Sequence, residues 1–210
     1  MEEKNQFKLL VEGKTDLHVI AALCQYYKVH ENFDIIDCGS MENVMKQLKL
    51  RLSNVNRNQI IGVLIDADTD IRGRIESIKA LLSSFCYNVP PEFPIDGLVI
   101  DAPIESLPRI GVWVMPNNKE VGMIEDFALS LIDGNDSLLY KAEQVIAELE
   151  KDSVQRYKSV HRSKAKIHTY LAWNDEPGMP IGLAITKRVL NPDSQGAIKI
   201  VDWLGSLFNV

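Results

Sequence analysis

Cysteine and long apolar runs are both scarce in this 210-residue sequence. The three cysteines, Cys24, Cys38 and Cys86, are widely spaced. They therefore predict neither a zinc knuckle nor a disulfide framework, and we expect reduced, mostly buried thiols. No run approaches the roughly 20 apolar residues of a membrane span, and the charged residues 1–4 are unlike a signal peptide. We expect a cytoplasmic protein with no membrane partner.

Positive charge is also in short supply. The chain has 23 Lys and Arg against 29 Asp and Glu, for a formal net charge of −6. This balance argues against a uniformly positive surface that coats DNA or an anionic membrane. The Gly-x-x-x-x-Gly-Lys-Ser/Thr pattern is missing as well, so Lys14, which follows Gly13, has no motif support for binding ATP.

Short apolar runs alternate with helix-like stretches in the first half of the chain, which predicts strand-helix-strand units and a parallel sheet. The expected strands are residues 7–11, 33–37, 60–65, 98–101 and 111–115. The expected helices are 15–28, 41–54, 71–85, 125–131, 138–158, 163–173 and 201–208. We therefore predict an α/β fold, with a parallel sheet flanked by helices over residues 5–120 and a helical extension over 121–210 packed on that core.

Acidic residues follow three of the expected strands. In an open parallel sheet the functional crevice lies outside the carboxyl ends of the strands, so these acids are expected at one edge. They are Glu12, Asp16, Asp66, Asp68, Asp70, Glu125 and Asp126. Packed carboxylates repel one another unless cations compensate them, and all-oxygen ligands select hard ions such as Mg²⁺, Mn²⁺ or Ca²⁺.

Each acid taken singly has a structural interpretation too. Glu12, Asp16 and Asp70 stand where a carboxylate favours a helix start, and an Asp-x-Asp after an apolar strand is common. Glu125 and Asp126 have the weakest case for metal binding, because a helix N-terminus favours acids in any event. Their joint placement is what favours a metal site.

Two segments resemble a known family. Residues 10–16, Leu-Val-Glu-Gly-Lys-Thr-Asp, and residues 64–68, Leu-Ile-Asp-Ala-Asp, are similar to the motifs of the Toprim domain, a metal-binding α/β module of topoisomerases, bacterial primases and OLD-family nucleases. The match covers roughly residues 5–120. Residues 113–118, 122–126 and 177–178 resemble the DUF3226 group, a bacterial Toprim-like family of uncharacterised function that is similar to the OLD nuclease domain.

The resemblance implies roles for several acids. In the Toprim pattern Glu12 serves as metal ligand or general acid/base, while Asp66 and Asp68 hold magnesium. OLD-type domains add acids in the places of Asp16 and Glu125 and use two metals. With Asp70, these residues form the expected site for two Mg²⁺ or Mn²⁺ ions. The sequence has no counterpart of the topoisomerase tyrosine domain, the primase zinc module or the OLD ATPase domain.

Basic residues gather in residues 151–166, the most basic stretch of the chain. They either line a track for nucleic-acid phosphates or form the solvated end of a helix. The candidates for nucleic-acid contact are Lys14, Arg156, Lys158, Arg162 and Lys164. The resemblance to OLD-type sites implies that Lys164 or Lys166 would stabilise developing charge at the metal site, and we assign that catalytic role to Lys166, with Glu12 and Asp66.

The sequence thus yields two hypotheses. In the first, the chain is a metal-dependent nuclease or phosphotransfer protein acting on nucleic acid. In the second, it is a module that binds metal and a nucleotide or nucleic acid and depends on a separate protein partner for catalysis. Homo-oligomerisation is left open by both.

Overall fold

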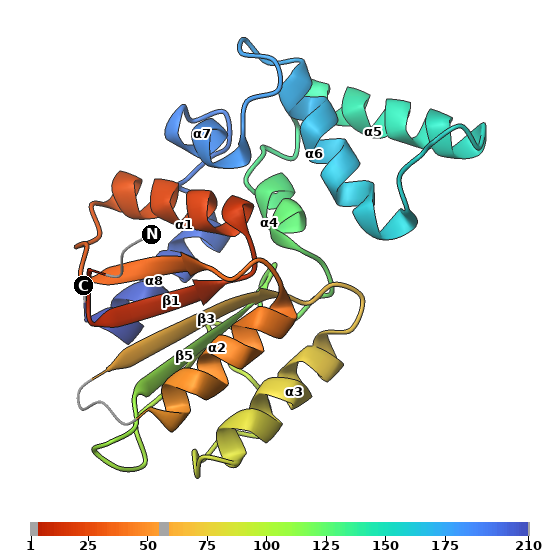
Figure 1. The fold of residues 1–210 in the computed structure, drawn as a ribbon. Coiled ribbons are helices and arrows are strands. Elements are labelled where there is room, and N and C mark those ends of the chain that lie inside the picture. The colour runs from red at the N-terminus through yellow and green to blue at the C-terminus, as the bar shows by residue number, and fades with distance from the viewer. Residues whose placement is uncertain (1–3, 55–58, 210) are drawn as a thin grey trace.

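A five-stranded sheet forms the centre of the molecule, seen in a computed structural model that describes residues 4–54 and 59–209 (Figure 1). The strands lie in the order β2-β1-β3-β5-β4, and β4 alone is antiparallel to its neighbour. Their bounds are β1 Phe7–Val11, β2 Phe33–Asp37, β3 Ile60–Asp66, β4 Leu98–Ile100 and β5 Arg109–Met115. The predicted α/β class is confirmed, with one antiparallel edge strand.

Helices cover both faces of the sheet. Two helices pack on one face, α2 (Met41–Ser53) and α3 (Ile71–Ser83), and two on the other, α1 (Lys14–Tyr27) and α8 (Gln195–Phe208). Neighbouring residues of β3 serve opposite faces: Val63 belongs to the core under α2 and α3, and Leu64 to the core under α1 and α8. Burial on both sides explains the continuous apolar run of this strand.

A pair of glycines allows α8 to lie close to the sheet. Gly62 on β3 and Gly111 on β5 are directly paired in the ladder. A Cβ atom on Gly111 would lie 2.4 Å from Leu207 Cδ2, and one on Gly62 would lie 3.0 Å from the same atom. The side chain of Leu207 therefore occupies the space that the two missing side chains leave.

The remaining helices lie above the carboxyl edge of the sheet (Figure 1). They are α4 (Ile124–Ser130), α5 (Ser137–Lys151), the 3-10 turn η1 (Ser159–His161), α6 (Arg162–Ala172) and α7 (Ile181–Thr186). Helices α5 and α6 pack against each other as a hairpin, and α7 packs on α1.

Three features of the second half differ from prediction. Helix α7 was not expected, α8 begins at Gln195 rather than at residue 201, and α5 ends at Lys151 rather than at residue 158. The early end of α5 follows from Ser153, whose φ of 55° is left-handed and incompatible with a continuing helix.

Two further observations concern the cysteines and the length of the helices. All three cysteines are free, but Cys24 and Cys38 are only half-buried and Cys86 is exposed, so the expectation of mostly buried thiols was wrong. No helix in the described part of the chain is both long and apolar enough to cross a membrane.

Candidate carboxylate site

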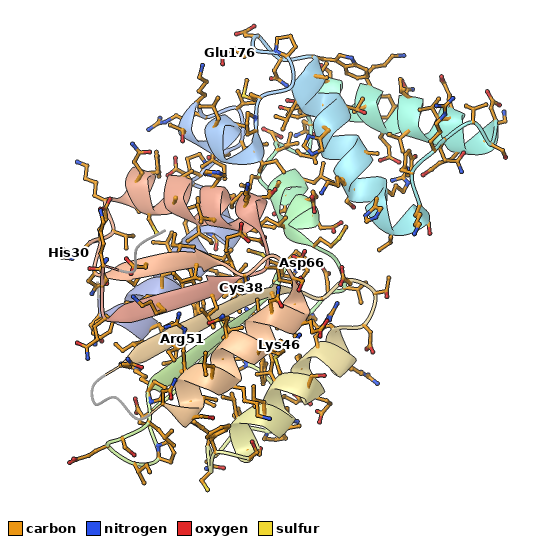
Figure 2. The ribbon with its side chains drawn as sticks, in the orientation of Figure 1. His30, Cys38, Lys46, Arg51, Asp66 and Glu176 are labelled. Atoms are coloured by element: carbon orange, nitrogen blue, oxygen red, sulfur yellow. The ribbon has the colours of Figure 1, made fainter. Side chains whose placement is uncertain are left out.

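Three loops bring acidic residues to the carboxyl edge of the sheet. Glu12 follows β1, Asp66 ends β3, and Glu125 stands in the first turn of α4, after β5. Because β1, β3 and β5 are neighbours in the sheet, these loops are adjacent. Figure 2 shows Asp66 at this edge, beneath α4.

Backbone hydrogen bonds connect Glu12 and Asp66 to the loops around them. The backbone N–H of Asp66 donates to Glu12 Oε1 at 2.9 Å. The N–H of Ile124, the first residue of α4, donates to Asp66 Oδ1 at 2.9 Å. The side chains of Glu12 and Asp66 are therefore held at the place where α4 begins.

Asp16 has a buried oxygen without a partner. It occupies the third position of α1, where the N–H of Gly13 donates to its Oδ2 at 3.0 Å. Its side chain is only 4% exposed, and no group among the described residues donates a hydrogen bond to Oδ1. A buried acceptor in this condition has lost its hydration, so it is a ready ligand atom for a cation.

Asp126 holds the corresponding position in α4 and is fully engaged. The N–H of Met123 donates to its Oδ2 at 2.8 Å, and the hydroxyl of Ser163 donates to its Oδ1. Asp126 thus completes the start of α4 and ties it to α6. Asp16 performs the same capping with one oxygen and leaves the other free.

Five acids at this edge form what we call the carboxylate cluster: Glu12, Asp16, Asp66, Asp68 and Glu125. Their pKa values show how closely they interact. Burial raises the pKa of Asp66 to about 9, and the charges of Asp16, Glu12, Glu125 and Asp68 add to that rise. Burial, with the charges of Glu12 and Glu125, raises the pKa of Asp16 to about 7. Burial also raises the pKa of Glu12, against the opposing effect of the Asp66 N–H. Without a cation, Asp66 therefore holds a proton at neutral pH, and Asp16 titrates near neutral pH.

Asp68 sits at the open side of the cluster and is paired with Arg74 of α3. Its φ of 50° is left-handed, and its backbone exchanges two hydrogen bonds of 2.8 Å with Gly122. These bonds join the loop after β3 to the loop after β5. Asp70 instead caps α3 by accepting from the N–H of Gly73 at 2.9 Å, so its observed contact is structural.

The structure places the two candidate lysines against different partners. Lys164 Nζ lies 3.0 Å from Glu125 Oε1, and Glu125 is only 3% exposed. Lys166 Nζ lies 2.8 Å from Glu143 Oε2, on α5. Of the two, Lys164 is therefore the one in contact with the carboxylate cluster.

The other predicted nucleic-acid contacts are dispersed. Arg162 joins α6 to α5 through Glu143 and Glu150. Arg156 and Lys158 are exposed in the connection between α5 and η1, and Lys14 is exposed at the start of α1. Arg156, Lys158 and Lys14 are thus accessible, whereas Arg162 is engaged within the hairpin.

Sequence reasoning missed three residues of this region, Arg74, Gly122 and Ser163. Arg74 lies six positions after Asp68, and their ion pair depends on the left-handed turn at Asp68. Gly122 has a φ of 140°, and a Cβ there would lie 2.8 Å from Asp126 Oδ2. Only the glycine gave a signal, because such a backbone favours that residue.

The acids fit a hard divalent cation by chemistry, since all are oxygen ligands and Asp16 Oδ1 is unengaged. In the arrangement seen, no three Asp, Glu, His or Cys side chains of the described residues are placed to hold one ion together. Backbone amides and the cations of Lys164 and Arg74 occupy their oxygens instead. Binding an ion here would require carboxylates to turn away from these partners.

Comparisons with known proteins place this geometry in context. A family model described as "Protein of unknown function (DUF3226)" matches residues 6–209. Among solved structures, the chain is similar to the C-terminal region of the OLD protein of Xanthomonas campestris pv. campestris, with 15% identity and a TM-score of 0.37. That match covers 93% of this chain and 82% of the other. A search of curated proteins found no significant match.

Proposed function

This chain belongs to the DUF3226 family, and from its own residues we propose a metal-dependent protein that cleaves or transfers phosphodiester groups of nucleic acid. The observation that carries the proposal is the buried carboxylate cluster with the unengaged Asp16 Oδ1. A protein keeps mutually repelling buried acids at a cost in stability, and a bound cation repays that cost. The resemblance of residues 10–16 and 64–68 to Toprim motifs supports the same chemistry.

The residues that would hold two Mg²⁺ or Mn²⁺ ions are Glu12, Asp16, Asp66, Asp68 and Glu125. Divalent ions bound by carboxylates lower the pKa of water and stabilise charge on phosphoryl oxygens, which suits in-line phosphoryl transfer. Asp70 is left out of this set because its carboxylate caps α3.

Lys164 and Arg74 are proposed to change partners when the site is loaded. Each now neutralises one acid, Glu125 and Asp68 respectively. Ions that neutralise those acids would release the ammonium and guanidinium groups for the phosphates of a substrate. The exposed Arg156 and Lys158, in the connection between α5 and η1, would contact phosphates further along the backbone.

The second candidate is a partner-dependent module. It is favoured by the absence, in the described residues, of three acids that already enclose one ion. In this case a protein or nucleic-acid partner would draw the carboxylates together.

Incubation with single- and double-stranded DNA and RNA, in Mg²⁺, Mn²⁺ or EDTA, tests the proposal. Cleavage is expected with metal only, and Asp66→Asn should abolish it. Asp37→Asn is the matched control, because Asp37 ends β2 at the same sheet edge and its side chain accepts a local hydrogen bond from the N–H of Gly39. Cleavage that persists in EDTA or in Asp66→Asn would overturn the proposal. Metal binding without cleavage of any substrate would favour the partner-dependent module.

A further inference from the structure

One edge of the central sheet is open. Strand β2 pairs with β1 on its inner side, and no strand of the described residues pairs with its outer side. The opposite edge is better protected, because β4 has only 3 residues and the carbonyl of Leu98 accepts from the indole N–H of Trp203 at 3.1 Å. An edge strand with free backbone groups is a template for a strand of another chain.

Three residues of β2 direct their backbone groups away from the sheet. The N–H of Cys38, directly after the strand, donates to the carbonyl of Val11 on β1 at 3.0 Å. Backbone groups alternate in direction along a strand, so alternate residues before Cys38 also bond to β1. The residues between them, Phe33, Ile35 and Asp37, therefore point their N–H and C=O groups outward. We call these three residues the open edge.

A groove of about 920 Å³ runs along the open edge. Residues from both faces of β2 line it, since Ile35 packs on the core under α1 and Ile36 on the core under α2. The side of the groove above β2 is formed by one stripe of α1: Leu17, Ala21, Cys24, Gln25 and Lys28. Because the middle of this stripe consists of small side chains, a second helix can approach α1 closely there.

The two ends of the open edge differ in charge. Asp37 stands at the carboxyl end of β2. At the amino end, Lys4 and Lys28 line the groove with Glu31, and neither lysine forms an ion pair with a described residue. Asp34, also in the groove, is neutralised by a lysine of β1 at 2.7 Å. A strand of the same sequence that runs antiparallel to β2 thus brings the acidic end of each strand to the basic end of the other.

We propose that two copies of this chain pair through β2, as antiparallel strands related by a two-fold axis at Ile35. In this register Ile35 exchanges backbone hydrogen bonds with the same residue of the other copy, and Phe33 exchanges them with Asp37. All outward groups of both open edges are then satisfied. The carboxylate of Asp37 in each copy meets the ammonium of Lys28 in the other.

The two-fold axis is perpendicular to the sheet, so both α1 helices lie on the same face with their groove stripes toward each other. The two carboxylate clusters lie at opposite edges of one continuous sheet. The interface is therefore independent of the proposed function.

Sedimentation equilibrium of the full chain in EDTA measures self-association without a contribution from metal. The wild type should form a dimer. Ile35→Pro removes an outward N–H at an edge position that tolerates proline, and it should abolish the dimer. Lys28→Glu places a second carboxylate beside Asp37 and should raise the dissociation constant about tenfold or more. Lys49→Glu is the matched control, because it makes the same charge change at an exposed lysine of α2.

Exchange of the charges tests the antiparallel register. Asp37→Lys should weaken the dimer as Lys28→Glu does, since each variant creates two like-charge contacts across the axis. A mixture of these two variants should form heterodimers more tightly than either variant self-associates, as measured by fluorescence energy transfer between labelled chains. The contact lies outside the carboxylate cluster, so Asp37→Asn still serves as the control for metal binding.

Amide hydrogen exchange locates the contact on the backbone. The N–H of Ile35 should exchange more slowly as the protein concentration rises and dimers form. The N–H of Ile36 is the control within the same strand, because it already bonds to β1 and should not respond to concentration.

Three results would overturn the proposal. The first is a chain that stays monomeric at every concentration, and the second is a dimer that Ile35→Pro and Lys28→Glu leave intact. The third is a mixture of Asp37→Lys and Lys28→Glu that forms no heterodimer. If Ile35→Pro does not fold, the mixed variants and the exchange of the Ile35 amide decide. None of these measurements depends on whether the protein cleaves nucleic acid.

Discussion

Single residues at the sheet edge combine burial with unmet bonding capacity. Asp16 keeps a buried oxygen without a donor, and Asp66 is surrounded by four other acids that raise its pKa. In a protein without a metal these features reduce stability, because a buried carboxylate must hold a proton or remain unsolvated. Their joint presence at one edge is therefore the residue-level basis for the proposed cation site.

The first prediction concerns the pH dependence of stability in EDTA. The pKa of Asp66 rises from 3.8 in the unfolded chain to about 9 in the folded one, so its stabilising effect is complete below about pH 4 and is lost as the pH rises toward 9. Asp66→Asn removes this loss while keeping an acceptor for the Ile124 N–H. As the pH rises from 5 to 8.5, the free energy of unfolding of the variant should therefore increase relative to that of the wild type by more than about 1 kcal/mol.

Urea denaturation of both proteins at pH 5 and at pH 8.5 measures this change in relative stability. A stability difference between wild type and Asp66→Asn that does not change with pH would show that Asp66 titrates normally. Addition of Mn²⁺ should reverse the trend for the wild type alone, since ligand carboxylates bind metal in the ionised form.

The second prediction distinguishes the two lysines of α6. Lys164→Met removes the cation that now neutralises the buried Glu125, so Mn²⁺ affinity should rise about threefold to tenfold. Lys166→Met should leave it unchanged, because the ammonium of Lys166 pairs with Glu143. Calorimetric titration of both variants at one pH gives the comparison. Equal effects of the two substitutions would contradict the assigned contacts.

At the scale of elements, the sequence predicted the strands well and the later helices less well. Residues 7–11 and 33–37 match β1 and β2 in full, because alternating or continuous apolar runs report burial on one or both faces. The short helix α7 was missed since its stability depends on packing against α1, where a Cβ on Gly182 would lie 2.7 Å from the carbonyl oxygen of His18. Local sequence carries no record of that contact.

For the carboxylate cluster too, the sequence predicted some features and not others. Glu12, Asp16, Asp66 and Glu125 could be placed at one edge because each follows a strand that was expected to be parallel, and the carboxyl ends of parallel strands meet there. The partners Arg74 and Lys164 could not be chosen from the sequence. Their ion pairs depend on a left-handed turn and on how α6 packs over α4.

The third prediction tests how α8 packs on the face of the sheet. Gly111→Ala places a methyl group 2.4 Å from Leu207 Cδ2 and should cost about 1–3 kcal/mol of unfolding free energy through overpacking. Leu207→Ala leaves a cavity and should cost about 2–5 kcal/mol. The double variant should be more stable than the sum of the two costs implies, as measured by urea denaturation. Strict additivity would mean that the two sites do not touch.

For the whole molecule, a net charge of −6 is compatible with a nucleic-acid partner when charge is resolved by position. The acids converge on one sheet edge, and two divalent ions there would offset four of the six negative charges. Lys164 contacts Glu125 at that edge, and the α5–α6 hairpin, whose connection carries the exposed Arg156 and Lys158, lies above the same edge (Figure 1). The global balance therefore hides local ion pairs at this edge, those of Lys164 with Glu125 and of Arg74 with Asp68.

The fourth prediction uses salt to count contacts between the hairpin and the nucleic-acid backbone. If Arg156 and Lys158 each contact one phosphate, the Arg156→Ala, Lys158→Ala double variant should reduce the slope of log affinity against log salt by about 1.4 for a single strand. Filter binding from about 50 to 200 mM salt supplies the slope. A weaker affinity with an unchanged slope would point to lost folding of the hairpin rather than lost phosphate contacts.

Titration of the metal-free protein with Mn²⁺, followed by electron paramagnetic resonance, tests the central claim most directly. The account predicts that about two ions bind to the wild type and couple magnetically, that Asp66→Asn loses this binding, and that Asp37→Asn retains it. Equal, weak binding to all three proteins would contradict a divalent metal site in the carboxylate cluster.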